Sequence, residues 1–101
     1  MTVALVTGGR DFCEIRPGAD HMGERRALGF ALDWVKPTAV HALEAESGPA
    51  RIAKIYTERR GIAFSVERVK PDVVIAFPGA SEAALRRARE LEIDVMEVWV
   101  K

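Results

Sequence analysis

The chain has few residues of the kinds that cross-link a fold or bind metals. Its 101 residues include one cysteine, Cys13, and two histidines, His21 and His41. A single cysteine excludes an intrachain disulfide framework, and these three residues do not have the spacing of a zinc site. We therefore expect no metal, no cofactor and a reducing, cytoplasmic environment.

Net charge and long apolar runs are also lacking. Fifteen Lys and Arg residues balance fifteen Asp and Glu residues, so the formal net charge is zero. A neutral chain lacks the electrostatic footprint that draws proteins to nucleic acid or to an anionic membrane. No apolar run approaches the ~18–20 residues that span a bilayer, and no secretory leader is visible. We expect neither nucleic acid nor membrane as a partner.

What the chain does have is the composition of an ordinary globular domain, with 49% hydrophobic and 30% charged residues. A chain of this length buries enough surface for one core, but not for two. We expect a single domain over residues 1–101.

Short β-branched runs alternate with longer amphipathic segments. We expect strands at residues 2–7, 39–43, 62–66, 72–77 and 94–100, and helices at residues 21–35, 49–60 and from 81 or 82 to about 92. This alternation predicts an α/β fold, a small Rossmann-like three-layer sandwich with a mostly parallel sheet of four to five strands. In the order 3-2-1-4-5, residues 67–71 barely reach from the third strand to the fourth. Either the third strand is vestigial, or it pairs elsewhere, or a partner chain is involved.

The first helix has the clearest signals. Asp20 can cap its start, and Lys36-Pro37 ends it. Its apolar face is widened by Phe30 and Trp34, which we expect in the core together with Trp99, although such aromatics could also form a dimer surface.

Right-handed crossovers place the loops after the first, second and fourth strands at the carboxyl edge of the sheet, where such folds bind ligands. In the first of these loops, Gly8 and Gly9 let backbone N–H groups approach a ligand. Arg10 adds a planar cation suited to phosphate or carboxylate, and Asp11 follows it. The alternative is an ordinary Gly-Gly turn, since neither a GxGxxG fingerprint nor a P-loop is present.

The other two loops offer helix N-termini. After the fourth strand, Pro78 and Gly79 precede Ser81, an N-cap that leaves unpaired N–H groups for an anion, although Glu82 competes for that role. After the second strand, Ser47 and Gly48 could form a third lip of the cleft. The nearby Glu44 and Glu46 disfavour a phosphate there.

Candidates for acid, base or nucleophile are scattered. Asp11, Glu14 and Asp20 could supply a general base, but solvated loop carboxylates are the simpler interpretation. Neither histidine is paired with a Ser or Cys in a recognisable nucleophile motif, and Cys13 is a nucleophile by position only.

Two segments together resemble a known family. VTGGRDF (residues 6–12) and PDVVIAFPGASEAALRRARELEIDVMEV (residues 71–98) are similar to the opening and closing motifs of the YspA-like, cytoplasmic YpsA-related family of the SLOG superfamily. The resemblance implies a Rossmann-like fold that binds nucleotides or nucleotide-derived ligands such as ADP-ribose or NAD-related molecules. ERRGI (residues 58–62) resembles the end of the family's second helix.

Three departures qualify what the resemblance implies. The middle loop keeps one glycine of a GGARGAD-type motif, and the insert between the third and fourth strands is missing. The catalytic Glu of LOG-type phosphoribohydrolases corresponds here to Ala84.

We therefore expect a domain that senses or sequesters a nucleotide-derived small molecule. Gly8, Gly9, Arg10, Gly79 and Ser81 would make the principal contacts, with Asp11, Ser47, Gly48 and Pro78 beside them. The alternatives are a nucleotide-processing hydrolase that uses Asp11 or Glu82, and a degenerate domain that acts as a dimeric interaction module.

Overall fold

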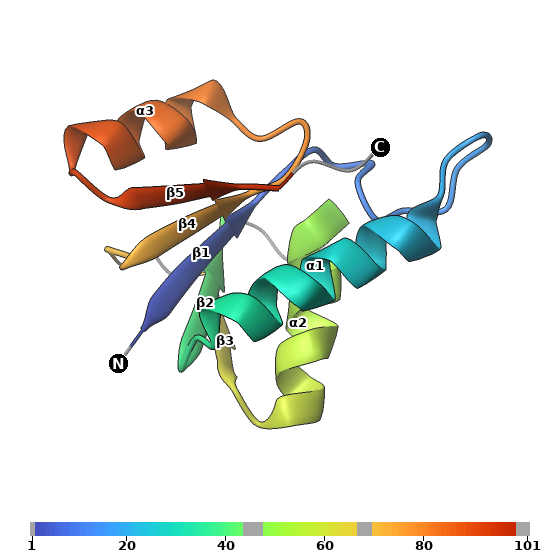
Figure 1. Cartoon of the computed structure of the whole chain (residues 1–101), viewed down its shortest axis with the longest axis horizontal. Coiled ribbons are helices and arrows are strands. Elements are labelled where there is room, and N and C mark those ends of the chain that lie inside the picture. The colour runs from blue at the N-terminus through green and yellow to red at the C-terminus, as the bar shows by residue number, and fades with distance from the viewer. Residues whose placement is uncertain (1, 44–47, 67–69, 99–101) are drawn as a thin grey trace.

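The computed structural model describes residues 2–43, 48–66 and 70–98, and these form a three-layer α/β sandwich (Figure 1). The elements follow in the order β1 (Val3–Thr7), α1 (His21–Val35), β2 (Ala39–Ala42), α2 (Gly48–Arg60), β3 (Ala63–Ser65), β4 (Val73–Ala76), α3 (Glu82–Glu90) and β5 (Asp94–Glu97). The predicted fold class is confirmed, and each predicted element is present, with ends that differ by a few residues or less within the described residues. Residues 99–100 of the last predicted strand lie outside the described residues.

All neighbouring strands pair in parallel, in the order β3-β2-β1-β4-β5. Helices α1 and α2 cover one face of the sheet and α3 covers the other (Figure 1). This division follows from right-handed crossovers, because the chain moves in one direction through β1, β2 and β3 and in the other through β4 and β5.

The third strand lies where the 3-2-1-4-5 order requires. Phe64 of β3 pairs with Val40 of β2, so β3 is a short edge strand and does not pair elsewhere. Three inter-strand steps of ~4.8 Å separate β3 from β4, a lateral distance of about 14 Å. Eight Cα-to-Cα steps from Ser65 to Val73 reach about 27 Å, so no partner chain is needed to close the topology.

Local signals explain the ends of α1. The Asp20 side chain accepts a hydrogen bond from the Gly23 amide at 2.9 Å, which confirms the predicted N-cap. At the other end Lys36 has φ 52°, a left-handed conformation that terminates the helix before Pro37. The helix therefore begins and ends where the sequence predicts.

The core lies between the sheet and the α1 and α2 layer. Leu28 and Leu32 of α1 are fully buried against β-strand residues such as Val6 and Ile75. The prediction for Phe30 and Trp34 is wrong, because their side chains are 66% and 81% exposed. At 100° per residue, Phe30 and Trp34 lie about a third of a turn or more from the centre of the buried stripe of α1. The apolar face of α1 is therefore narrower than predicted, and both aromatic side chains lie outside it. Trp99 lies outside the described residues.

Candidate functional site

The carboxyl edge of the sheet carries a pocket of about 320 Å³. This volume lies at the lower end of the range of small-ligand sites, which is about 300–1,000 Å³. Its walls come from β1, α2 and the loops after β1, β2 and β4, and the lining residues are Val6, Thr7, Gly8, Gly9, Arg10, Leu43, Pro49, Ala50, Gly79 and Ser81. Five of the predicted site residues, Gly8, Gly9, Arg10, Gly79 and Ser81, are therefore brought together.

Glycines let the three loops at this edge pack backbone against backbone. A β-carbon on Gly48 would lie 2.6 Å from the Gly9 carbonyl oxygen, and one on Gly79 would lie 2.8 Å from the Gly9 Cα. Gly48 and Gly79 also have φ values of +65° and +84°, which L side chains rarely adopt. A β-carbon on Gly8 would lie 2.7 Å from Cγ of Pro49. These glycines are therefore needed for the close packing of the loops around the pocket, independently of any contact with a ligand.

Some of the backbone N–H groups that we expected to be open to a ligand at the carboxyl edge are hydrogen-bonded within the chain. The Gly9 amide donates to the Pro78 carbonyl at 2.9 Å, so Pro78 and Gly9 join the loop after β1 to the loop after β4. Phe12 and Phe77 reinforce this junction by stacking with their ring centroids 5.2 Å apart. The role predicted for Gly9, a backbone donor to a ligand, is taken by a contact within the chain.

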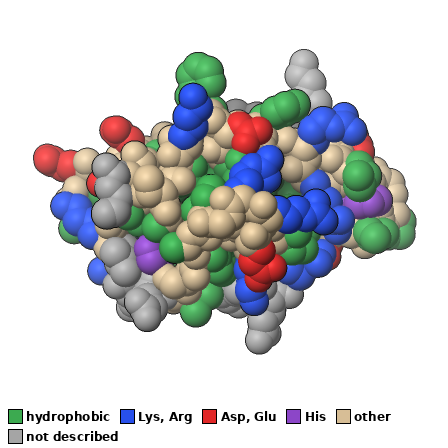
Figure 2. Space-filling view, turned by 90° about the horizontal axis from the view of Figure 1, so that it is seen from below, with side chains coloured by type: hydrophobic (Ala, Val, Ile, Leu, Met, Phe, Trp, Pro, Cys, Tyr) green, Lys and Arg blue, Asp and Glu red, His purple; other side chains and the backbone are tan. Residues whose placement is uncertain are grey.

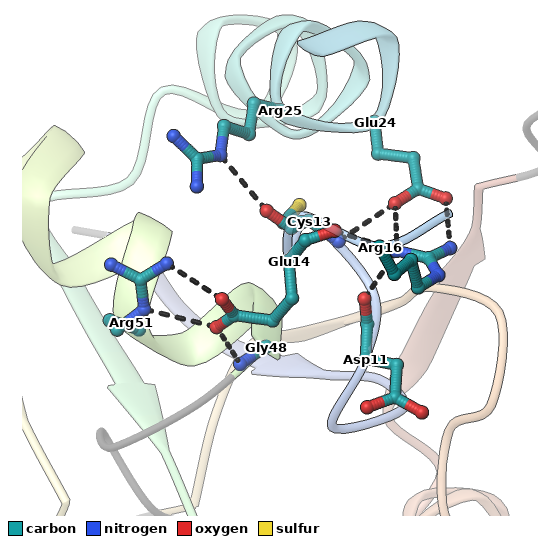
Figure 3. Close-up of polar contacts among 8 residues, drawn as sticks. All are labelled: Asp11, Cys13, Glu14, Arg16, Glu24, Arg25, Gly48 and Arg51. Atoms are coloured by element: carbon teal, nitrogen blue, oxygen red, sulfur yellow. Dashed lines mark hydrogen bonds and ion pairs between the residues drawn. The ribbon is translucent and has the colours of Figure 1, made fainter. Parts of the chain in front are cut away.

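An internal carboxylate occupies the N-terminus of α2 (Figure 3). Glu14 accepts a hydrogen bond from the Gly48 amide at 3.0 Å, and it forms a two-point ion pair with Arg51 at 3.0 and 2.9 Å. The Arg51 hydrogen bond is the main reason that the pKa of Glu14 is lowered. The Gly48 amide therefore donates to the carboxylate of Glu14 and not to a ligand. Glu14 is an ion-paired residue and not a solvated base. Ser47 lies outside the described residues.

A second ion pair fixes the loop after β1 on α1 (Figure 3). Arg16 binds Glu24 through two hydrogen bonds of 2.8 and 2.7 Å, and the Arg16 hydrogen bond lowers the pKa of Glu24. Glu24 also accepts from the Cys13 amide at 2.9 Å, and Arg25 donates to the Cys13 carbonyl at 2.9 Å. Cys13 has φ 71°, so α1 satisfies both backbone groups of a residue in a left-handed conformation.

The environment of Cys13 does not suit a nucleophile. Its side chain has no exposed surface, and burial raises the pKa of the thiol to about 12. A thiol with this pKa carries almost no thiolate at neutral pH. Cys13 is therefore a small core residue.

The N-terminus of α3 opens onto the pocket. Ser81, the predicted N-cap, accepts a long hydrogen bond of 3.4 Å from the Ala84 amide and also lines the pocket. The amides of Glu82 and Ala83 belong to the first turn, where no intrahelical acceptor exists. Ser81, the N-cap of α3, is thus the residue of this helix end that lines the pocket.

Asp11 and Glu82, the residues of the hydrolase alternative, are both exposed, and neither is among the lining residues of this pocket. The Asp11 carbonyl accepts a hydrogen bond from Arg16, whereas its carboxylate points away from the ion-pair cluster (Figure 3). The described residues therefore place no carboxylate on the pocket wall.

A contact that sequence reasoning missed joins β2 to β3. Ser65 and His41 are opposite each other in the strand register, and the Ser65 hydroxyl lies 2.5 Å from Nδ1 of His41. The predicted strands at residues 39–43 and 62–66 would have placed His41 opposite Phe64, so the sequence pattern did not reveal this contact. Neither residue lines the carboxyl-edge pocket, so we assign the pair to the sheet.

No family model, no curated protein and no solved structure matches this chain. The resemblance to the SLOG superfamily therefore stays a prediction from the two sequence motifs.

Among the described residues, no group of three or more His, Cys, Asp or Glu side chains could hold a metal ion. No helix within residues 2–43, 48–66 and 70–98 is both long and apolar enough to cross a membrane.

Proposed function

We propose that the carboxyl-edge pocket binds a nucleotide or a nucleotide-derived small molecule, which the domain senses or sequesters. The observation that carries this proposal is the asymmetry of the pocket wall. Leu43, which follows β2, contributes apolar surface together with Pro49 and Ala50 of α2, whereas Gly79 and Ser81 bring the N-cap of α3 to the wall on the β4 side.

This asymmetry matches a ligand with an apolar ring and an anionic group. The first turn of α3 offers unpaired amides and the positive end of a helix dipole, which favour phosphate. Arg10 supplies the cationic side chain of the wall, and a guanidinium binds phosphate with two parallel hydrogen bonds. The base or ribose then contacts Leu43 and Pro49.

The two helix ends near the pocket differ in their suitability for phosphate. Glu14 already supplies the anion at the start of α2, and its carboxylate would repel a second anion there. We therefore place the phosphate at Ser81 and Arg10. A volume of about 320 Å³ leaves room for about one mononucleotide-sized group, so the second half of a ligand such as ADP-ribose would extend beyond the pocket.

A thermal-shift panel tests the proposal with AMP, ADP-ribose, NAD, cyclic nucleotides and ribose 5-phosphate. A ligand at 100 times its dissociation constant stabilises the native state by about 2.7 kcal/mol, which raises the Tm of a domain this size by roughly 10–20 °C. Arg10→Ala should then raise the dissociation constant, measured by calorimetry, about tenfold or more. Arg87→Ala, on the exposed face of α3, is the matched control and should leave it unchanged.

Two results would overturn the proposal. One is the absence of a shift with every ligand of the panel at millimolar concentration. The other is a bound ligand whose affinity is the same for Arg10→Ala and for Arg87→Ala. Release of free base during the same incubations would instead identify a hydrolase.

A further inference from the structure

An exposed apolar ridge runs along α1. Met22, Phe30 and Trp34 are 54%, 66% and 81% exposed, and Arg26 completes the series at intervals of four residues. Residues four apart form a continuous row on a helix surface. We refer to Met22, Arg26, Phe30 and Trp34 as the α1 ridge.

The α1 ridge is unusual for a surface because it places two large aromatic side chains on one row. Single exposed apolar residues are common on proteins, whereas contiguous ones mark interaction sites. Figure 2 shows hydrophobic side chains that protrude from the surface between Lys and Arg side chains. The buried stripe of α1 already packs on the sheet, so the α1 ridge has no role in the core.

We propose that the α1 ridge is the interface of a homodimer, in which α1 packs antiparallel against α1 of a second copy. Two charges, that of Arg26 on the α1 ridge and that of Asp33 beside it, favour this partner and this direction. Arg26 lies four residues before Phe30 and Asp33 lies three residues after it, and both are exposed. At a rise of 1.5 Å per residue, a twofold axis at Phe30 brings Arg26 of one copy within about 1.5 Å, along the axis, of Asp33 of the other.

The opposite direction lacks this complementarity. With the two helices parallel, the two Arg26 side chains would lie level with each other, and each would be about 10 Å along the axis from the nearest Asp33. Asp33 also bonds to the Tyr56 hydroxyl and lies 3.9 Å from Arg60 of its own chain, yet 56% of its side chain stays exposed. Its carboxylate is therefore accessible to a second Arg.

The antiparallel arrangement also suits the rest of the ridge. Arg26 of one copy faces Trp34 of the other, and an Arg over an indole ring gains a cation–π contact. Gly23 and Ala27 form the row beside the α1 ridge, and such small side chains leave a groove into which the opposite ridge can pack. Phe30 lies at the centre and meets its own copy.

The size of the aromatic surface is consistent with a dimer. Aromatic side chains bury about 150–250 Å² each, so four rings from two copies would remove on the order of 600 Å² from water. Specific interfaces begin at about 1,200 Å² in total, and the flanking side chains of α1 would supply the remainder. No residue of α1 lines the carboxyl-edge pocket, so this dimer and the proposed ligand site are tested independently.

Sedimentation velocity from micromolar to millimolar concentration tests the proposal. We expect a concentration-dependent dimer whose dissociation constant rises about tenfold or more in Phe30→Glu and in Trp34→Glu. Leu91→Glu, at a residue 42% exposed after α3, is the matched control and should leave it unchanged. A chain that stays monomeric at millimolar concentration would overturn the proposal, as would a dimer that both ridge variants leave intact.

Two further sets of variants test the direction of packing. Phe30→Cys should form an interchain disulfide under mild oxidation, whereas Met22→Cys should not, because its two copies would lie on the order of 20 Å apart. Cys13 is buried and adds no background. Arg26→Asp and Asp33→Arg should each weaken the dimer, and the double variant should restore it. Equal cross-linking of both cysteine variants, or no rescue by the double variant, would contradict the antiparallel interface.

Discussion

Glu14 and Arg51 lie 37 residues apart in the chain, and their side chains meet in a two-point ion pair at the start of α2. The pair joins the loop after β1 to α2 and supplies the anion that the helix N-terminus favours. Because this pair occupies the N-terminus of α2, the N-terminus of α3 is the helix end beside the pocket that is left for a ligand.

Replacing Glu14 with Gln should test how much this pair stabilises the fold. The amide oxygen can still accept from Gly48, so the variant removes the charge and keeps the shape. Both side chains are about one third exposed, and we expect a loss of about 1 kcal/mol in the free energy of unfolding, measured by urea denaturation. Glu58→Gln, on the exposed part of α2, is the control and should change it by less than about 0.5 kcal/mol. Equal effects of the two changes would contradict a stabilising pair.

The stability of the protein should fall in acid because of Glu14 and Glu24. Their pKa values are lowered below 4.5 in the folded state by Arg51 and Arg16, so the unfolded chain binds protons at a higher pH than the folded one. The stabilisation is present above pH 4.5 and is lost as the pH falls through the folded pKa values. Urea denaturation at a series of pH values should show this decline. The double variant Glu14→Gln and Glu24→Gln should show a shallower one, and an unchanged slope would contradict the assignment.

Two glycines should respond to alanine in opposite directions. Gly48→Ala forces a β-carbon to within 2.6 Å of a backbone oxygen at a positive φ, and we expect it to destabilise the domain by about 1–3 kcal/mol. Gly29→Ala meets nothing within 4 Å inside α1, and it should stabilise by about 0.5–1 kcal/mol. Thermal or urea denaturation of both variants measures this. Similar changes in the free energy of unfolding of both variants would contradict the view that close packing of the loops requires a glycine at position 48.

Cys13 should be inert in the native protein. With no exposed surface and a pKa of about 12, its thiol can react with a thiol reagent at neutral pH only after the chain opens. The rate of labelling should therefore rise steeply with urea. Rapid labelling in native buffer would show that the loop after β1 opens locally.

Much of the architecture follows from local patterns. Asp20, Lys36 and Pro37 specify the ends of α1 through capping and φ, which depend on neighbouring residues alone. The alternation of strands and helices, joined by right-handed crossovers, is sufficient to predict the α/β class, whereas the place of the third strand was left open until the structure showed the order β3-β2-β1-β4-β5. That order in turn brings Gly8, Arg10 and Ser81 to one edge of the sheet, as predicted, because the ends of parallel strands meet there.

Other features depend on contacts between segments distant in sequence. The helical period places Phe30 and Trp34 only within a broad apolar arc, and the position of the sheet against Leu28 and Leu32 decides that both aromatics face outward. In the same way, Glu14 reads as a solvated loop residue until α2 brings Arg51 to it.

The amino-acid order alone thus sets the elements, their caps and the edge at which the loops gather, since these depend on backbone preferences and short-range spacing. The folded packing alone decides which backbone donors are consumed, as at Gly9 and Gly48, and which helix end is left open at Ser81. The reason is physical: hydrogen-bond partners and exposure are set by whichever groups come within a few ångströms in space, and sequence spacing does not encode that distance.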